Sequence, residues 1–337
     1  MRLIDVRQRF RLRCAAMAES HTIPVVAADQ VRAALPYPQL IEALRHAFAN
    51  ADQTHVPRRH AHTLGGEATL LLMPAWRAHQ QLGVKLVTVM PDNQARGLPT
   101  VHALYVLSDT ETGVPLGIMD GEVLTLRRTA AVSALASIFL SRADSASLLI
   151  VGTGRLAPEM AVAHCAVRDI QRVMVWGRNS DKAQHTIARM QEAGLPAHVQ
   201  VDVANSLTSA CAAADIICCA TTSTEPLLRA DQVKAGTHVD LVGGFRPHMR
   251  EADDALMATA ALFVDTREGA LAEAGDLLQP IQAGRLRTTD IRAELSALAN
   301  AGHPGRQTAD QITLFKSVGS GLADLAAAGL VHQLSVR

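Results

Sequence analysis

The sequence has few aromatic side chains and no excess of either charge sign. Aromatic residues number ten in a chain of 337 (two Trp, two Tyr and six Phe), and 32 Lys plus Arg balance 32 Asp plus Glu. Because base stacking needs aromatic rings and nucleic-acid surfaces need a basic excess, these counts argue against a nucleic-acid-binding protein. The core must be built from Ala, Val, Leu and Ile, which suits helices that alternate with buried strands.

Cysteine pairs, metal-binding motifs and long apolar runs are also missing. The five cysteines form no CxxC pair, which favours a reducing cytoplasm over a disulfide framework. The 14 histidines show no HExxH or comparable spacing, so we expect no metal site. No apolar stretch approaches the ~18–20 residues that span a bilayer, so we expect no membrane segment. Residues 1–22, rich in arginine, are predicted to be a disordered extension.

The first half of the chain predicts a mixed, largely antiparallel α+β unit. A length of 337 residues suggests about two domains at roughly 100–200 residues each. Apolar residues at helical spacing predict a helix over 38–49, and an Ala- and Leu-rich run predicts a longer one over 121–140. Between them, short strand-like runs are separated by turn residues. These runs are 69–73, 83–89 and 101–107.

From Ser147 onward the pattern changes to strands that alternate with helices. The continuous apolar run 147–151 is typical of a parallel strand covered on both faces. Helices are expected over 157–167 and 180–192. Further strands are expected at 172–175, 197–201, 216–220, 238–242 and 262–264. The alternation predicts an α/β fold with a parallel, Rossmann-type sheet.

A glycine-rich turn between the first strand and helix of this half predicts a dinucleotide site. Gly152-Thr153-Gly154-Arg155-Leu156-Ala157 fits G-x-G-x-x-A, and it follows a buried strand and opens a helix, as that motif requires. Gly152 permits the tight turn, and Gly154 lets the backbone approach a pyrophosphate. The N–H groups and positive dipole end of the helix would then face the phosphates.

The end of the second parallel strand bears on the choice of cofactor. NAD-binding folds place a carboxylate there for the ribose 2′-hydroxyl, but this strand is followed by Arg178 and Asn179, and the first acid is Asp181. Arg178 can pair with a 2′-phosphate, and such a charge-assisted contact contributes roughly 1.5–3 kcal/mol. The sequence therefore predicts NADPH as cofactor, with NADH possible.

Several segments together resemble the ornithine cyclodeaminase/μ-crystallin family, in the correct order from about residue 23 to the end. They are 72–75 (LMPA), 82–87 (LGVKLV), 97–100 (GLPT), 109–117 (DTETGVPLG), 120–131 (DGEVLTLRRTAA), 152–157, 242–244 (VGG) and 312–325 (ITLFKSVGSGLADL). The resemblance implies a substrate-binding and dimerisation domain built from 23–130 and 311–337. A Rossmann-type NADP-binding domain, 131–310, would be inserted into it.

The same resemblance implies a set of site residues. Arg59, Lys85 and Arg128 match positions that hold a substrate carboxylate, and Lys85 is also a candidate proton donor. Arg127 is expected to be structural. Further cofactor-binding positions besides the glycine turn, Arg178 and Asn179 are Thr100, Thr221, Val242 and Val318.

Phe245 separates the activities within the family. In the cyclodeaminases an Asp follows the Val-Gly-Gly segment and takes part in the amine chemistry, whereas Phe245 cannot transfer a proton. Residues 239–254 are instead similar to bacterial Δ1-pyrroline-2-carboxylate reductases. The resemblance therefore implies NADPH-dependent reduction of cyclic ketimines to L-proline and L-pipecolate, with Phe245 near the substrate ring. Some reductases of this kind serve hydroxyproline breakdown.

Three other functions stay open from the sequence. They are an L-alanine or other amino-acid dehydrogenase, an ornithine cyclodeaminase, and a non-catalytic NADPH-binding or small-ligand-binding protein like some μ-crystallins. A homodimer and a small imino-acid substrate are implied by the resemblance alone.

Overall fold

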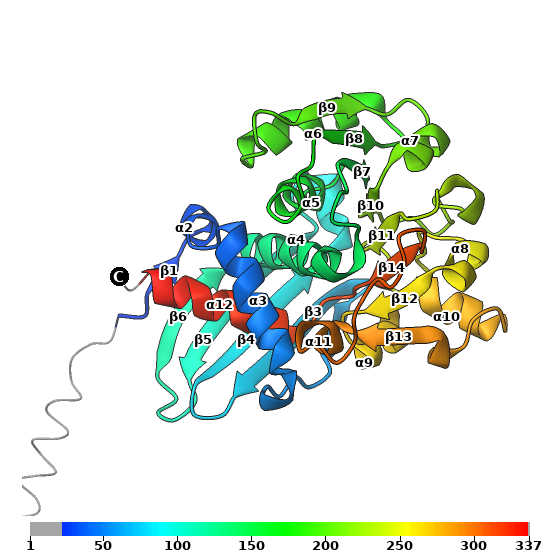
Figure 1. Cartoon of the computed structure of the whole chain (residues 1–337). Coiled ribbons are helices and arrows are strands. Elements are labelled where there is room, and N and C mark those ends of the chain that lie inside the picture. The colour runs from blue at the N-terminus through cyan, green and yellow to red at the C-terminus, as the bar shows by residue number, and fades with distance from the viewer. Residues whose placement is uncertain (1–21, 336–337) are drawn as a thin grey trace, which may run out of the picture.

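The computed structural model describes residues 22–335, which form two sheets with helices packed around them (Figure 1). The predicted extension over 1–22 lies outside the described residues except for its last position. The predicted α/β class is confirmed: one sheet is mostly antiparallel and the other is entirely parallel.

The six-stranded sheet comes from the first third of the chain, in the order β1-β6-β5-β4-β3-β2. All its pairs are antiparallel except β1 with β6. The three predicted strands extend further than expected. Three others were not predicted: β1 has two residues, β2 is polar, and β6 contains Pro115 and Gly117, which are unfavourable in strands. The strands are β1 (Val25–Val26), β2 (His60–Gly65), β3 (Ala68–Arg77), β4 (Gln81–Val89), β5 (Val101–Asp109) and β6 (Pro115–Asp120).

Helices from both ends of the described chain cover one face of this sheet. α3 (Tyr37–Ala49) follows a proline at its N-cap, and its buried residues Leu40, Ile41, Leu44 and Phe48 lie on one face, as predicted. The C-terminal helix α12 (Gly321–Ser335) packs beside α3 and against β3, β4 and β5. Figure 1 shows α12 running across the sheet to end near β1. The remaining elements here are α2 (Ala28–Ala33), η1 (Ala51–Gln53) and η2 (Pro91–Arg96).

The eight-stranded sheet is parallel throughout, in the order β13-β12-β14-β11-β10-β7-β8-β9. Strand order reverses between β7 and β10, which is the switch point where dinucleotides bind in such folds. β9 starts later than predicted because Val199 N–H closes a turn on Pro196 O. The strands are β7 (Ser147–Val151), β8 (Arg172–Trp176), β9 (Gln200–Val203), β10 (Ile216–Cys219), β11 (His238–Leu241), β12 (Ala261–Val264), β13 (Ile291–Glu294) and β14 (Thr313–Lys316).

Helix α4 (Gly121–Leu140) joins the two sheets and packs against α3, α5, α12 and β14. It corrects the expectation that no apolar stretch reaches membrane-spanning length, since by length and composition this helix is apolar enough to cross a bilayer. However, 72% of its most apolar window is buried inside the protein, which is the position of a core helix. The other helices are α5 (Leu156–Cys165), α6 (Ser180–Glu192), α7 (Leu207–Ala213), η3 (Ala230–Gln232), α8 (Asp254–Thr259), α9 (Arg267–Glu273), α10 (Gly275–Gln282), η4 (Thr288–Asp290) and α11 (Leu295–Ala299).

Strand pairing bears on the predicted domain limits. β14 falls within 311–337, the segment assigned to the substrate domain, yet it pairs with β11 and β12 in the parallel sheet. Only α12 returns to the six-stranded sheet. If domains are divided by strand pairing, the return to the substrate domain therefore begins after Lys316.

Candidate functional site

The glycine turn after β7 has the geometry that a dinucleotide requires. Gly152 has φ +125°, and a Cβ there would lie 2.6 Å from Ala220 O at the end of β10, so a larger residue would clash. Gly154 has no neighbour within 4 Å of where its Cβ would be, which leaves the backbone open to a phosphate. Ala157 is fully buried in the first full turn of α5. The turn therefore fits a pyrophosphate at the N-terminus of α5.

The other predicted residues of this turn differ in their surroundings. The Thr153 methyl group packs against Gly177, where a Cβ would lie 2.5 Å from it. Arg155 forms an ion pair with Glu122 of α4. Leu156 packs against the main hydrophobic core. The side chains of Thr153 and Leu156 thus stabilise the turn by packing, and the backbone N–H groups of the turn are the part that can bind a ligand.

The carboxyl edge of the parallel sheet collects nearly all predicted cofactor positions. Arg178 and Asn179 follow β8, Thr221 follows β10, Val242 follows β11 and Val318 follows β14, each within three residues of the strand end. Because all eight strands run in one direction, these residues share one edge of the sheet. Arg178 is exposed, and Asn179 caps α6 by accepting from Lys182 N at 2.9 Å.

The predicted carboxylate-binding residues converge on a buried acid that the sequence analysis did not single out. Asp324 of α12 accepts from Arg128 Nε at 2.7 Å and pairs with Lys85 Nζ at 2.8 Å. Asp324 is fully buried, and Lys85 and Arg128 are exposed by only 3% and 6%. Lys85 points inward from β4, and Arg128 comes from α4. Asp324 therefore ties the sheet to two helices through charge.

Arg59 approaches the same cluster from the loop before β2. Its Nη2 donates to Val318 O at 3.3 Å and to Gly319 O at 3.4 Å, and its Nε pairs with Glu273 at 2.9 Å. A Cβ on Gly319 would lie 3.0 Å from Arg128 Nη1. Arg59 and Arg128 thus flank one short segment, 318–319, directly after β14.

Burial changes the protonation chemistry of this cluster. Burial is the largest effect on Lys85, and with the nearby Arg128 and Arg59 it outweighs the attraction of Asp324, so the pKa of Lys85 falls to about 8. Burial alone would raise the pKa of Asp324, but Arg128 and Lys85 together hold it below its ordinary value. The lysine is therefore a stronger acid than usual beside a firmly ionised carboxylate.

A cavity of about 440 Å³ opens beside this segment, where the two sheets meet. Its lining includes Arg59, Met73, Asp265, Glu273 and Gly319, drawn from both halves of the fold. Lys85 and Arg128 do not line it directly: Arg128 lies against Gly319, and Lys85 is joined to Arg128 through Asp324. The cavity is large enough for a small imino acid, and Arg58 and Arg59 are the cations among its lining residues.

Two predicted residues lie apart from this cluster. Thr100 precedes β5, and its carbonyl accepts from Met90 N at 2.7 Å. Phe245, in the loop after β11, is 41% exposed and does not line the cavity. Arg127 points away from the cluster, donating to Leu35 O, pairing with Glu159 at 3.1 Å and stacking on Tyr37.

Sequence reasoning missed acids rather than cations. Asp324 lies inside the 312–325 segment that carried the resemblance, and it is the one charged residue between Gly321 and Leu330. An isolated acid on an apolar helix indicates a buried partner of opposite charge, and that signal could have found it. Asp265 accepts from Val318 N and Gly319 N at 3.0 and 2.8 Å, and it carried no comparable signal.

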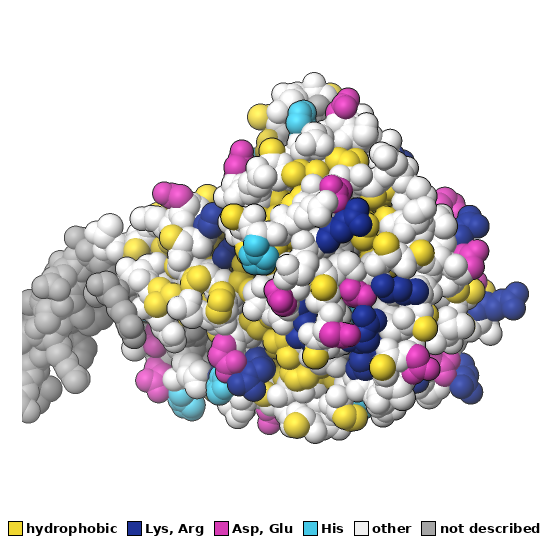
Figure 2. All heavy atoms as spheres, turned by 45° about the horizontal axis from the view of Figure 1, so that its top comes forward, with side chains coloured by type: hydrophobic (Ala, Val, Ile, Leu, Met, Phe, Trp, Pro, Cys, Tyr) yellow, Lys and Arg dark blue, Asp and Glu magenta, His cyan; other side chains and the backbone are white. Residues whose placement is uncertain are grey.

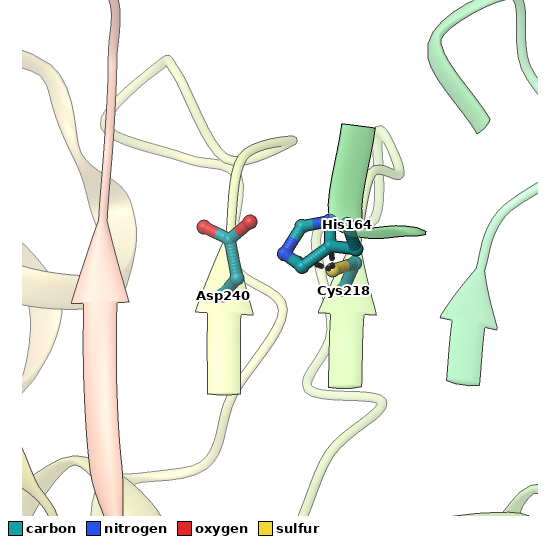
Figure 3. A group of neighbouring side chains, drawn as sticks. All are labelled: His164, Cys218 and Asp240. Carbon is teal, nitrogen blue, oxygen red and sulfur yellow. Dashed lines mark hydrogen bonds between the residues drawn. The ribbon is translucent and has the colours of Figure 1, made fainter. Parts of the chain in front are cut away.

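A second buried polar cluster lies between α5 and the parallel sheet. It contains His164 of α5, Cys218 of β10 and Asp240 of β11 (Figure 3). Their ligand atoms lie within 4.8 Å of one another, close enough to suggest a metal. Burial, however, lowers the pKa of His164 to about 4, raises that of Asp240 to about 7, and raises that of Cys218 further. Lys316 also acts on Asp240 as a nearby positive charge. Burial thus shifts all three groups toward their neutral forms.

Surface charge shows no field of one sign on the face drawn in Figure 2, where basic and acidic side chains are interspersed. This agrees with a net charge of zero.

Known proteins resemble this chain in sequence and in structure over most of its length. The family model of the ornithine cyclodeaminase/mu-crystallin family matches residues 21–336. A Δ1-pyrroline-2-carboxylate reductase of Colwellia psychrerythraea is 37% identical over 310 residues, covering 90% of this chain and 96% of the relative. The structure of Thermococcus litoralis Δ1-pyrroline-2-carboxylate reductase, in complex with NADH and L-proline, superimposes with a TM-score of 0.87 at 31% identity, covering 93% and 98% of the two chains.

An archaeal alanine dehydrogenase dimer with bound NAD superimposes with a TM-score of 0.85 at 26% identity, covering 93% and 96% of the two chains. The predicted resemblance is thus confirmed over nearly the whole described chain, and the chain belongs to the ornithine cyclodeaminase/mu-crystallin family.

Proposed function

We propose that this protein reduces the C=N bond of small cyclic imino acids, converting Δ1-pyrroline-2-carboxylate to L-proline and Δ1-piperideine-2-carboxylate to L-pipecolate. The observation that carries the proposal is that Arg59 and Arg128 flank the 318–319 segment, next to the carboxyl edge of the parallel sheet, while Lys85 shares Asp324 with Arg128. An anion-binding group therefore adjoins a dinucleotide edge. The names of the relatives support the same reaction.

The reaction needs a hydride at C2 of the imine and a proton on its nitrogen. The nicotinamide ring of the cofactor supplies the hydride when bound. Arg59 in the cavity lining and Arg128, whose Nη atoms lie beside the lining residue Gly319, offer N–H donors suited to a carboxylate. Holding the substrate in one orientation is a large part of catalysis for such a step. Lys85, with a pKa of about 8, is mostly an ammonium at neutral pH and can give up its proton more readily than a free lysine.

NADPH is the proposed cofactor, and NADH is the alternative. Arg178 and Asn179 stand after β8, where a carboxylate would select the ribose 2′-hydroxyl of NADH. Arg178 is exposed at this edge and can reach a 2′-phosphate. The backbone of residues 152–156 would hold the pyrophosphate, and Thr221, Val242 and Val318 would line the rest of the dinucleotide.

Phe245 and Thr100 remain proposed contacts. Both would need a bound ligand or a second copy of the chain beside them, because neither lines the cavity. Phe245 still disfavours the cyclodeaminase alternative, since it supplies no carboxylate to the amine.

One substrate panel tests the activity against its alternatives. Consumption of NADPH or NADH is followed with Δ1-pyrroline-2-carboxylate, with Δ1-piperideine-2-carboxylate and with pyruvate plus ammonia, while L-ornithine is assayed separately for ammonia release. We expect turnover of both cyclic imines. Turnover of pyruvate plus ammonia alone would indicate an amino-acid dehydrogenase, and ammonia released from L-ornithine would indicate a cyclodeaminase. Binding of cofactor without any turnover would indicate a binding protein.

A homodimer is proposed through the outer face of the six-stranded sheet. Leu86 and Leu104 are cross-strand neighbours on this face, and they and Val106 are 38%, 50% and 37% exposed. Contiguous exposed apolar residues on a sheet mark an interaction surface, and the alanine dehydrogenase of similar fold is a dimer. The double substitution of Leu86→Glu and Leu104→Glu should shift sedimentation to a monomer. A monomeric wild type would contradict the proposal.

We place the protein in the cytoplasm, as five cysteines without a CxxC pair suggest.

A further inference from the structure

A buried carboxylate, Glu251, joins the ends of two neighbouring strands at the proposed cofactor edge. Its Oε1 accepts from Thr221 N at 2.7 Å and from Thr221 Oγ1 at 2.8 Å. Its Oε2 accepts from Gly243 N at 2.8 Å and from Gly244 N at 3.4 Å. Glu251 has no exposed surface. One side chain thus satisfies donors from the loops that follow β10 and β11.

The packing around this carboxylate leaves little freedom. A Cβ on Gly243 would collide with the backbone of Thr221, and one on Gly244 would lie 2.5 Å from Asp276 Oδ2. Only glycine at these two positions allows the loops to pack back to back. The positions of Thr221 and Val242 are therefore set by contacts around Glu251 rather than by their own side chains.

A second acid fixes Glu251 itself. Asp276 Oδ1 accepts from Glu251 N at 2.7 Å and from Ala252 N at 3.0 Å, and Asp276 Oδ2 pairs with Lys316 Nζ at 3.1 Å. Asp276 and Lys316 are both fully buried, and Lys316 is the last residue of β14. A continuous set of charged groups thus crosses the ends of β10, β11 and β14.

We propose that Glu251 is a positioning residue for the nicotinamide half of the cofactor, an inference that rests on the proposed function. The Thr221 hydroxyl donates its proton to Glu251 and accepts from Ser223 N at 3.3 Å, so toward a ligand it can only accept, through its remaining lone pair. The carboxamide NH₂ of nicotinamide is a donor of the matching kind. Glu251 thereby makes the Thr221 hydroxyl a hydrogen-bond acceptor toward the cofactor. It also holds in place the two loops that carry Thr221 and Val242.

An isosteric substitution separates this role from simple packing. Glutamine at position 251 fills the same space, but its NH₂ group cannot accept from the N–H groups on that side. Either the N–H and hydroxyl of Thr221 or the N–H groups of Gly243 and Gly244 then lose their acceptor. The adenosine half of the dinucleotide, proposed to lie near the glycine turn and Arg178, has no contact with Glu251.

The experiment measures the Kd of Glu251→Gln for two ligands by calorimetry. One is NADPH or NADH, whichever the wild type binds more tightly. The other is the matching fragment without nicotinamide, 2′-phospho-ADP-ribose or ADP-ribose. We expect the Kd of the dinucleotide to rise about 2- to 12-fold, which corresponds to the loss of one neutral hydrogen bond between Thr221 and the carboxamide, while that of the fragment stays unchanged. Equal weakening of both ligands, or no change in either, would overturn the proposal.

Asp215→Asn is the matched control. Asp215 also accepts from backbone N–H groups, those of Ala146 and Ser147 at 3.1 and 3.0 Å, but it lies at the opposite, amino end of β10. We expect this variant to lose stability without changing either Kd.

Thr221→Val keeps the test falsifiable if Glu251→Gln does not fold. It removes the hydroxyl alone and should weaken the dinucleotide but not the fragment. If it leaves dinucleotide binding unchanged, the proposal is overturned. Because no imine is present in these titrations, a lack of imine turnover would count against the proposed substrate and leave this result standing.

Discussion

Two buried clusters handle ionisable groups in opposite ways. Behind the cavity, Lys85, Arg128 and Asp324 are kept charged and paired, and the pKa of Asp324 is held below its ordinary value despite full burial. Under the parallel sheet, burial drives His164 and Asp240 toward their neutral forms, with pKa values of about 4 and about 7. Burying unpaired charge is costly, so charge persists where partners support it.

The difference indicates which cluster serves a ligand. A charged cluster beside a cavity can bind an anion and move a proton, whereas a neutral cluster under a sheet mainly fills the core.

Replacing Lys85 should have the largest effect on activity. If its ammonium serves the reaction, kcat/KM of Lys85→Met falls about 10²–10⁴-fold, the usual range for a lost general acid. Since the pKa of Lys85 is about 8, wild-type activity should fall as pH rises through 8 and the ammonium is lost. Lys85→Arg keeps the charge but does not titrate there, so its profile should lack this descending limb. A limb that survives in Lys85→Arg would remove Lys85 as the titrating group.

Removing the shared acid should cost stability as well. Asp324→Asn leaves Lys85 and Arg128 buried without their counter-charge, and breaking a buried pair lowers the free energy of unfolding by about 3–5 kcal/mol. Urea denaturation at neutral pH measures this change. Glu42→Gln, which breaks an exposed pair with Arg45, is the control and should have no comparable effect. If Asp324→Asn lowers the free energy of unfolding as little as Glu42→Gln does, the charged cluster does not stabilise the fold.

Arg178 should affect cofactor choice more than overall rate. Loss of one charge-assisted contact with a 2′-phosphate, roughly 1.5–3 kcal/mol, should reduce the preference for NADPH over NADH by about 10- to 100-fold in Arg178→Ala. The ratio of kcat/KM for the two cofactors measures it. An unchanged ratio would mean that another residue selects the cofactor.

Asp240→Asn should change stability little at low pH, and its effect should grow as pH rises. The carboxyl of Asp240 keeps its proton longer in the folded than in the unfolded protein, so its contribution to stability is present at low pH and is lost as pH rises through about 7. Asparagine imitates the protonated acid. The wild type should therefore lose up to about 4 kcal/mol relative to the variant between pH 4 and pH 8. A constant difference across this range would mean that Asp240 is ionised and paired.

The parallel sheet and its glycine turn could be predicted from sequence because their signals are local. An apolar run, a G-x-G-x-x-A turn and a helix follow one another within about 20 residues, and helix α4 was predicted with its observed bounds. Short polar strands such as β2 gave no such signal. The expectation that no apolar stretch reaches spanning length was wrong for α4, because a core helix and a membrane helix can share the same length and composition.

The charged cluster could be predicted only through the family resemblance. Arg59, Lys85 and Arg128 lie far apart in the chain, and no periodicity relates them. Asp324 and Glu251 were missed because a buried acid is recognised by its partners, which only the folded structure brings together.

In the proposed reaction the charged cluster binds the carboxylate of the substrate, and a cofactor bound at the carboxyl edge of the parallel sheet supplies the hydride. The most direct test compares kcat/KM for Δ1-pyrroline-2-carboxylate with that for Δ1-pyrroline, which lacks the carboxylate, in the wild type and in Arg128→Met. We predict that the wild type prefers the carboxylated imine by about 10²–10⁴-fold, the value of two charge-assisted hydrogen bonds, and that Arg128→Met loses most of this preference. Equal turnover of the two imines by the wild type would contradict the account.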